Sequence, residues 1–316
     1  MSDKKRWSFL LDDEESTPSS SIKVDDDAFF NPMQEMNKIR YRCEQKNTTH
    51  TDKSMVFHAD MKKEYLTEFI KKDNTILVNS VLEDYVYKTE PKHFQIAMDS
   101  FRDLEFVKEN VLLKLDTNGK IQSIQNLEAI QDAWTSFRKD VLQYSDFFVE
   151  LKKVNEQAAQ DIIDSGNAEF GKEENLIKTY DKNLFYHLIL DTYLVDISNV
   201  AEHKKIKFLS QIFQNIEVEV DIVETTVSED DDFIHRRKVG TLQREKLDRD
   251  ELIRQYDQFY KPMVEYNFTE YEYMYRLSYV IDKKTGFISE GRAVFSEKVK
   301  NNYEFTTEFN LKQVQL

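Results

Sequence analysis

Long stretches of this chain alternate strictly between apolar and polar residues. In Ile216–Ile222, three acidic residues alternate with Ile and Val, and Lys38–Glu44 alternates in the same way. A period of two is typical of a β-strand with one buried and one solvated face. Strands with one wet face usually belong to antiparallel sheets. These stretches therefore predict antiparallel sheet in both the N-terminal and the C-terminal parts of the chain.

The composition favours long elements joined by few tight loops. The 316 residues include 16 Tyr and 22 Phe, but only 6 Gly and 4 Pro. Aromatic residues are enriched in strands, whereas Gly and Pro build tight turns. The length allows one large domain or two smaller ones.

Further strand patterns occupy most of the remaining N- and C-terminal sequence. We expect strands at Met55–Ala59, Tyr65–Lys71, Thr75–Tyr87, Glu270–Ile281, Phe287–Phe295 and Tyr303–Leu311, and a hairpin around Asn118-Gly119. In Glu270–Ile281, the residues on one face are Tyr271, Tyr273, Tyr275, Leu277, Tyr279 and Ile281. This stripe either packs as core or lines a surface that holds an apolar ligand, for which Tyr271, Tyr273 and Tyr275 are the candidate residues.

The middle of the chain has helical periodicity. Residues 93–106 have helix-like spacing, and Asn126 is placed to cap a helix whose pattern continues toward Ile162. Ser165-Gly166-Asn167 predicts a break before a second helix. Asp248 and Glu251 form a capping-box pattern for a later helix.

These patterns predict an α+β fold, with antiparallel sheets in the N- and C-terminal parts and a helical middle segment. We divide the chain into an acidic tail (1–30), an N-terminal α+β part (31–146), a helical segment (147–210) and a C-terminal sheet with one helix (211–316).

The tail carries a basic, then apolar, then acidic segment. Its polar composition predicts disorder when it is free. The residues suited to dock a partner are Lys5, Arg6, Trp7, Phe9, Leu10 and Leu11. Such a segment either folds into a groove or adds to a sheet edge of a partner, or it is an inert, solubilising terminus.

A formal net charge of -15 repels phosphate backbones and anionic lipid unless a local basic patch overrides it. We expect no nucleic-acid partner. The charge either keeps the protein soluble or forms an acidic surface for a basic protein partner. No apolar run approaches the roughly 18 residues of a membrane span, so we expect no membrane insertion. The apolar run at Trp7–Leu11 is shorter than a secretory signal core, which predicts a cytoplasmic location.

No arrangement of reactive residues predicts catalysis, a metal site or a cofactor. The single cysteine, Cys43, would form a catalytic dyad only if folding brought His50 or His58 to it. His187 and Asp191 are four residues apart, which is the spacing of a structural pair on a helix. A calcium loop at Asp116–Ile121 would lack carboxylates at its first and last positions. We expect a protein that is not an enzyme.

The segment Leu113–Phe137, with Leu115-Asp116-Thr117-Asn118-Gly119-Lys120-Ile121, Ile124, Asn126, Glu128, Ile130 and Trp134, resembles a pattern in uncharacterised bacterial envelope proteins. Those proteins have curved antiparallel sheets with helices on one side, loosely similar to lipoprotein carriers. The resemblance covers about a fifth of the chain and implies a sheet that wraps helices and a site for an apolar ligand. This chain departs from that pattern because it has no export signal or lipidated cysteine near its start.

We therefore expect a non-enzymatic, bacterial protein-interaction module that acts through its N-terminal docking peptide. An adaptor, an accessory of a secretion apparatus and an immunity protein for a basic toxin all suit this description. The alternative is a carrier or sensor of an apolar small molecule, which requires a cavity beside Tyr271, Tyr273 and Tyr275. The sequence leaves the oligomeric state and the partner open.

Overall fold

The computed structural model describes residues 10–12, 38–52, 54–72, 75–116, 119–193 and 203–316. The strands are β1 (Leu10–Asp12), β2 (Lys38–Thr51), β3 (Ser54–Lys72), β4 (Thr75–Glu90), β5 (Asn110–Leu115), β6 (Ile121–Ile124), β7 (His203–Leu209), β8 (Glu217–Glu229), β9 (Phe233–Leu242), β10 (Tyr271–Asp282), β11 (Ile288–Val299) and β12 (Tyr303–Val314). The α-helices are α1 (Gln95–Glu105), α2 (Leu127–Asp140), α3 (Asp146–Val154), α4 (Glu156–Phe170), α5 (Glu173–Asp181), α6 (Leu184–Tyr193), α7 (Arg249–Phe259) and α8 (Lys261–Val264).

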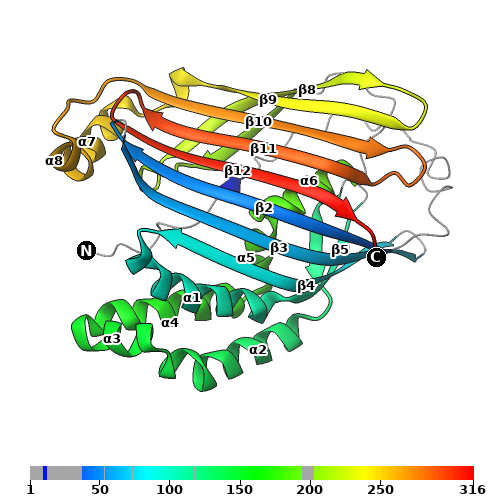
Figure 1. Ribbon diagram of the computed structural model, residues 1–316, viewed down its shortest axis with the longest axis horizontal. Coiled ribbons are helices and arrows are strands. Elements are labelled where there is room, and N and C mark those ends of the chain that lie inside the picture. Colours follow the sequence, from blue (N-terminus) through cyan, green and yellow to red (C-terminus); the bar gives the residue numbers. More distant parts are fainter. Residues whose placement is uncertain (1–9, 13–37, 53, 73–74, 117–118, 194–202) are drawn as a thin grey trace.

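The described strands form one antiparallel sheet of 12 strands, in the order β1-β7-β8-β9-β10-β11-β12-β2-β3-β4-β5-β6 (Figure 1). The α+β class, with antiparallel strands in both terminal parts and helices in the middle, is confirmed. β12 joins the two groups of strands because it pairs with β2, with Leu311 opposite Cys43. The N-terminal part and the C-terminal part of the chain therefore share one sheet.

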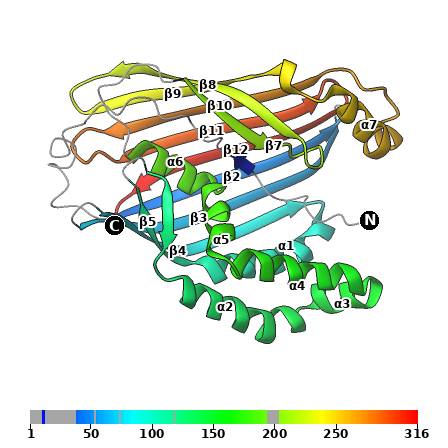
Figure 2. The ribbon, with the colours of Figure 1, turned by 180° about the vertical axis from the view of Figure 1, so that it is seen from behind.

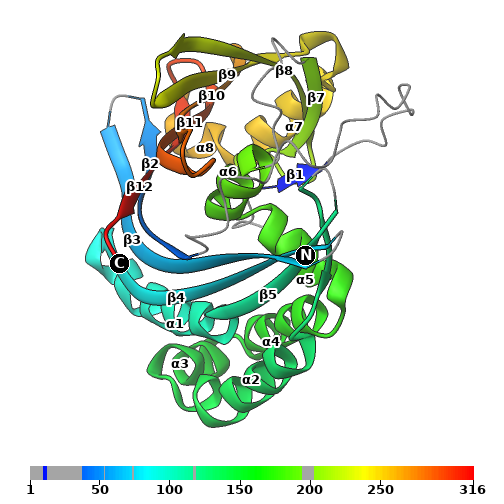
Figure 3. The same ribbon diagram turned by 90° about the vertical axis from the view of Figure 1, so that its right-hand side faces the viewer.

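The sheet curves around helix α6, while α1 to α4 gather beside β4 and β5 (Figures 2 and 3). On the inner face, Phe185 of α6 stacks on Tyr65 of β3 with ring centroids 4.0 Å apart. Leu188 of α6 lies so close to Gly291 of β11 that a Cβ atom at Gly291 would come within 2.4 Å of it. The missing side chain lets α6 lie directly on the sheet.

The prediction of one long helix from Leu127 toward Ile162 was wrong. The structure divides it into α2, α3 and α4. Ser145 caps α3 by accepting a hydrogen bond from the Phe148 amide at 3.3 Å, and Asn155 caps α4 by accepting one from the Ala158 amide at 3.0 Å. The break predicted at Gly166 lies inside α4. A Cβ atom there would come within 2.3 Å of the Trp134 ring, so this glycine allows close packing of α4 on α2.

The predicted caps have mixed outcomes. Asp248 caps α7, since its carboxylate accepts a hydrogen bond from the Glu251 amide at 3.0 Å. Asn126 precedes α2, but its side chain bonds to β5 instead of capping the helix. It accepts from the Leu112 amide and donates to the Asn110 carbonyl, both at 2.9 Å. The predicted hairpin between β5 and β6 is present, with a positive φ of 81° at Gly119.

Candidate functional site

The apolar part of the predicted docking peptide meets the sheet of this chain. Of its six residues, Leu10 and Leu11 lie in β1, whereas Lys5, Arg6, Trp7 and Phe9 lie outside the described residues. β1 pairs antiparallel with β7, which places Leu10 opposite Leu209 and Leu11 opposite Phe208. The segment predicted to add to a partner's sheet edge therefore contributes a strand to its own.

Strand β7 extends beyond β1. The three residues of β1 lie opposite Lys207–Leu209, so the first four residues of β7 continue past its end. Lys204 and Lys205 in that part are exposed, and Ile206 and Phe208 are buried. We did not predict β7 from the sequence, although Ile206 and Phe208 alternate with lysines and carry the period of a strand.

The tyrosine stripe of β10 faces inward, as the alternation predicted. Tyr271 and Tyr275 are buried, and Tyr273 is half-buried. The Phe208 ring lies 5.5 Å from that of Tyr273 and 5.6 Å from that of Tyr275. Tyr271 and Tyr275 therefore belong to the core, and Tyr273 lines a pocket.

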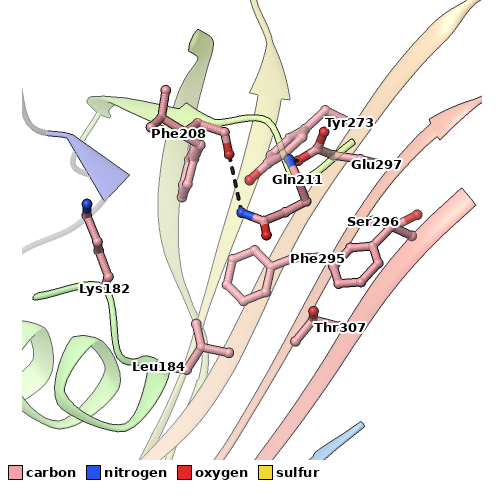
Figure 4. A pocket seen from close by; sticks show the side chains of 11 residues that line it. Lys182, Leu184, Phe208, Gln211, Tyr273, Phe295, Ser296, Glu297 and Thr307 are labelled. Carbon is pink, nitrogen blue, oxygen red and sulfur yellow. Dashed lines mark hydrogen bonds between the residues drawn. The ribbon is translucent and has the colours of Figure 1, made fainter. Parts of the chain in front are cut away.

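That pocket lies between the inner face of the sheet and the chain around β7 (Figure 4). Its apolar walls are formed by Leu184, Phe208, Leu209, Tyr273, Phe295 and Phe305. Its polar lining includes Lys182, Gln211, Glu297 and Thr307. Its volume is about 30 Å³, which suffices for about two water molecules.

Glu297 is the buried acid of this pocket. Its carboxylate accepts hydrogen bonds from Ser210 Oγ at 2.6 Å, from the backbone N–H of Gln211 at 2.7 Å and from Tyr271 Oη at 3.0 Å. Burial raises the pKa of Glu297, while these hydrogen bonds act in the opposite direction. Both carboxylate oxygens are engaged, so Glu297 fixes the connection after β7 to the floor of the sheet.

The reactive side chains considered in the sequence do not meet. Cys43 is buried on the inner face of β2, where burial raises the pKa of its thiol. His50 is seven residues further along the same strand and therefore projects from the other face. His187 Nε2 lies 3.3 Å from Tyr275 Oη, and the side chain of Asp191 lies outside the described residues.

A second concavity lies on the outer face of the sheet. It is a trough of about 760 Å³ that crosses β9, β10, β11, β12 and β2, and Val227 of β8 also lines it. Its outer-face charges are Arg42, Arg237, Arg292 and Lys312, together with Glu44 and Glu290. No sequence pattern predicts this trough, because its residues come from strands whose pairing is set by the fold.

Comparisons with known proteins identify no family. No protein-family model matches the chain, and no curated protein matches it. A solved structure of lipovitellin, described as showing lipid-protein interactions, aligns with 88% of this chain and 25% of its own chain, at 9% identity and a TM-score of 0.40. The chain thus spans about a quarter of that protein, and a likeness at this level supports no inference about function.

Two features are absent from the residues that the structure describes. Among these residues, no helix has the length and apolar character needed to cross a membrane. The same residues contain no group of three or more His, Cys, Asp or Glu side chains placed to hold a metal ion.

Proposed function

We propose that the protein is a non-enzymatic protein-interaction module that binds an extended peptide at the edge of β7. The peptide would add a strand beside β7 and place one apolar side chain in the pocket lined by Tyr273. In strand addition, main-chain hydrogen bonds supply affinity, and pockets for alternate side chains supply specificity. Roles as an adaptor or an immunity protein remain compatible with such a site.

One observation carries the proposal. Phe208 and Leu209 are two of the three residues of β7 that lie opposite β1, and both also line the pocket. The edge that accepts a strand and the pocket that accepts a side chain are therefore parts of one site. The chain's own Leu10 and Leu11 occupy the strand position, so they serve as a template for the partner sequence.

The size of the pocket favours a side chain over a lipid. Its volume of about 30 Å³ is far below the roughly 300–1,000 Å³ of pockets that enclose drug-sized ligands. A single aliphatic or aromatic group could enter by displacing Gln211, whose side chain projects into the pocket (Figure 4). An acyl chain would require the aromatic walls to separate.

The charge of β7 favours a peptide with acidic residues after its apolar ones. Asp12 of β1 lies opposite Lys207. A longer strand in the same register would place its next residues opposite Ile206, Lys205 and Lys204. Acidic residues follow Asp12 in this chain at Asp13, Glu14 and Glu15. Opposite charges on adjacent strands are favourable, by about 0.2–1 kcal/mol for each pair.

The hydrogen bonds of Glu297 support a role without catalysis. Glu297 is the acid that lines the pocket, and its oxygens already accept three hydrogen bonds. A general acid or base needs an oxygen directed at the substrate.

The test compares peptide binding by the intact protein and by a variant that lacks residues 1–30. A fluorescent peptide with the sequence of residues 4–15 should bind the deletion variant and bind the intact protein more weakly, because the tail competes. A peptide N-methylated at the positions of both Leu10 and Leu11 should lose binding, since one of two successive N–H groups must point at the neighbouring strand. Fluorescence anisotropy measures both, and the scrambled peptide is the control. Equal binding of the N-methylated and unmodified peptides would refute strand addition.

An affinity pull-down with the same two proteins tests whether the tail itself recruits partners. If residues 1–30 dock a partner, the deletion removes proteins from the captured set. If the edge of β7 is the docking site, the deletion adds them. Identical partner lists would contradict both roles.

The second candidate is a carrier or sensor of an apolar small molecule, which the mainly aromatic lining of the pocket favours. A small aromatic such as toluene should then raise the melting temperature of the protein, because a ligand that binds the native state stabilises it. Replacing Gln211 by Phe would fill the pocket and abolish that shift. The absence of a shift in the unmodified protein would exclude this candidate for ligands of that size.

A further inference from the structure

We propose that the trough on the outer face of the sheet binds an acidic polypeptide segment of a partner protein. Three successive residues line the trough on each of four strands, at His235–Arg237, Ser278–Val280, Glu290–Arg292 and Asn310–Lys312. The trough is therefore short along the strands and long across them. This site is separate from the edge of β7, and it stands on a different observation.

The charge of the trough is opposite to that of the molecule. Its outer face carries four cationic side chains, Arg42, Arg237, Arg292 and Lys312, and two acidic ones, Glu44 and Glu290. The whole chain has a net charge of -15. A positive recess in a negative molecule concentrates the local field and directs an anionic partner to that place.

Two of these cations, Arg292 and Lys312, form exposed ion pairs that can exchange, whereas Arg42 donates two hydrogen bonds to the half-buried Glu64 at 3.2 and 2.9 Å. Arg292 lies 3.5 Å from Glu308, with 60% and 44% of their side chains exposed. Lys312 lies 3.3 Å from Glu290, with 69% and 60% exposed. Exposed ion pairs contribute only about 0–1 kcal/mol each, so an arriving carboxylate can replace them at small cost.

Arg237 supplies a cation that is open to a ligand. It is exposed on β9 and forms no ion pair or side-chain hydrogen bond with the described residues. Arg237 pairs across the sheet with Ser278, which in turn lies opposite Arg292 on β11. The short serine between two arginines leaves space in which a carboxylate can contact both guanidinium groups, the geometry that favours Arg over Lys.

The dimensions fit a short extended peptide. Five strands about 4.8 Å apart span roughly 20 Å, which about seven extended residues cover at about 3.3 Å each. An acidic peptide carries less charge per length than a nucleic-acid duplex, so the net negative charge of the protein opposes it less. We therefore assign the trough to acidic polypeptide and make nucleic acid a competing outcome.

The experiment measures binding of a fluorescein-labelled peptide of about seven glutamates to the full-length protein by anisotropy. The test variant carries Arg237→Glu and Arg292→Glu. The control carries Lys298→Glu and Lys300→Glu, which change the charge equally and lie outside the trough, paired with Glu272. Circular dichroism and melting temperature establish that each variant is folded.

The proposal is supported by saturable binding whose affinity falls about tenfold or more in the test variant and less than about twofold in the control. The affinity should also fall as the salt concentration rises. Equal losses in both variants would show a general charge effect and overturn it, as would the absence of saturable binding. Tighter binding of an RNA oligonucleotide of equal charge, lost in the same variant, would overturn the assignment to polypeptide. Binding only after deletion of residues 1–30 would show that the protein's own tail, and not a partner, is the occupant.

Discussion

Lys63, Glu105, Lys108 and Glu169 form a charged cluster that is largely removed from water. Glu105 lies 2.6 Å from Lys63 Nζ, and Lys108 Nζ lies 3.2 Å from Glu169. Burial by itself would raise the pKa of Glu105, but the positive charges of Lys63 and Lys108 lower it to about 2. Within this cluster, the ionised carboxylate therefore compensates two buried cations.

Replacing Glu105 by Gln should lower the free energy of unfolding by about 3 kcal/mol at pH 7, because it leaves the largely buried Lys63 without its carboxylate, while Lys108 keeps Glu169. The folded-state pKa is below the ordinary value of 4.5, so the stabilisation is present above that value and is lost as the pH falls toward about 2. Urea unfolding of both proteins between pH 7 and pH 3 measures this. The difference between them should shrink at acid pH.

The matched control is Glu150→Gln. Glu150 pairs with Lys153, and the two side chains are 67% and 64% exposed, respectively. It should change the free energy of unfolding by less than about 1 kcal/mol. A difference between Glu105→Gln and the unmodified protein that stays constant with pH would contradict the electrostatic explanation.

At the scale of elements, two strand edges are covered by side-chain amides. Gln95 accepts from the Thr89 amide at 2.8 Å and donates to the Tyr87 carbonyl at 3.2 Å, beside β4. Asn126 makes the equivalent pair of bonds to Leu112 and Asn110 of β5. These amides take the place of a neighbouring strand and protect the edge from pairing with other chains.

Replacing Asn126 by Ala should destabilise the protein by about 1–3 kcal/mol, since two backbone hydrogen bonds of β5 are lost. Amide hydrogen exchange at Leu112 should accelerate. Asn126→Asp keeps the acceptor for the Leu112 amide but loses the donor to the Asn110 carbonyl. The exchange rate of the Leu112 amide in this variant should therefore lie between the rates in the unmodified protein and in Asn126→Ala. If Asn126→Ala leaves exchange at Leu112 unchanged, the amide does not replace a strand there.

At the scale of the whole molecule, the pairing of β12 with β2 closes the sheet between distant parts of the chain. Thr307 Oγ1 and Asn47 Oδ1 lie 3.0 Å apart at this seam, both buried and 260 residues apart in sequence. The strands on either side contribute to one hydrophobic core. The two terminal parts should therefore unfold together.

Replacing Thr307 by Val should lower the free energy of unfolding by about 1 kcal/mol, because the buried hydrogen bond is lost. The change should be the same whether urea unfolding is followed by circular dichroism or by Trp134 fluorescence in a Trp7→Phe background. Thr306→Val, on the outer face, is the control and should cost less than about 0.5 kcal/mol. Different shifts by the two probes would show that the parts unfold separately.

The alternation of residues predicted most of the strands because it is a local property, although the strands predicted at Met55–Ala59 and Tyr65–Lys71 are parts of the single strand β3. β8, β10 and the end of β12 follow stretches in which every second residue is apolar. Helix boundaries were predicted less well. The Ser-Gly-Asn sequence around Gly166 is typical of a helix break, but Gly166 lies inside α4, where its missing side chain leaves space for the Trp134 ring. Local sequence does not record which side chain will occupy the space that a glycine leaves.

The site depended on contacts that local sequence does not specify. Phe295, Glu297 and Val299 share one strand face, and an acid between two apolar residues there was a signal that sequence reasoning missed. The sequence by itself determined the strands, the inward tyrosine stripe and the charge. Only the tertiary structure decided that β12 pairs with β2, that Leu10 and Leu11 lie beside Phe208 and Leu209, and that Arg237 and Arg292 share a trough. A strand's faces follow from its own alternation, whereas its neighbours are chosen by packing across the whole chain.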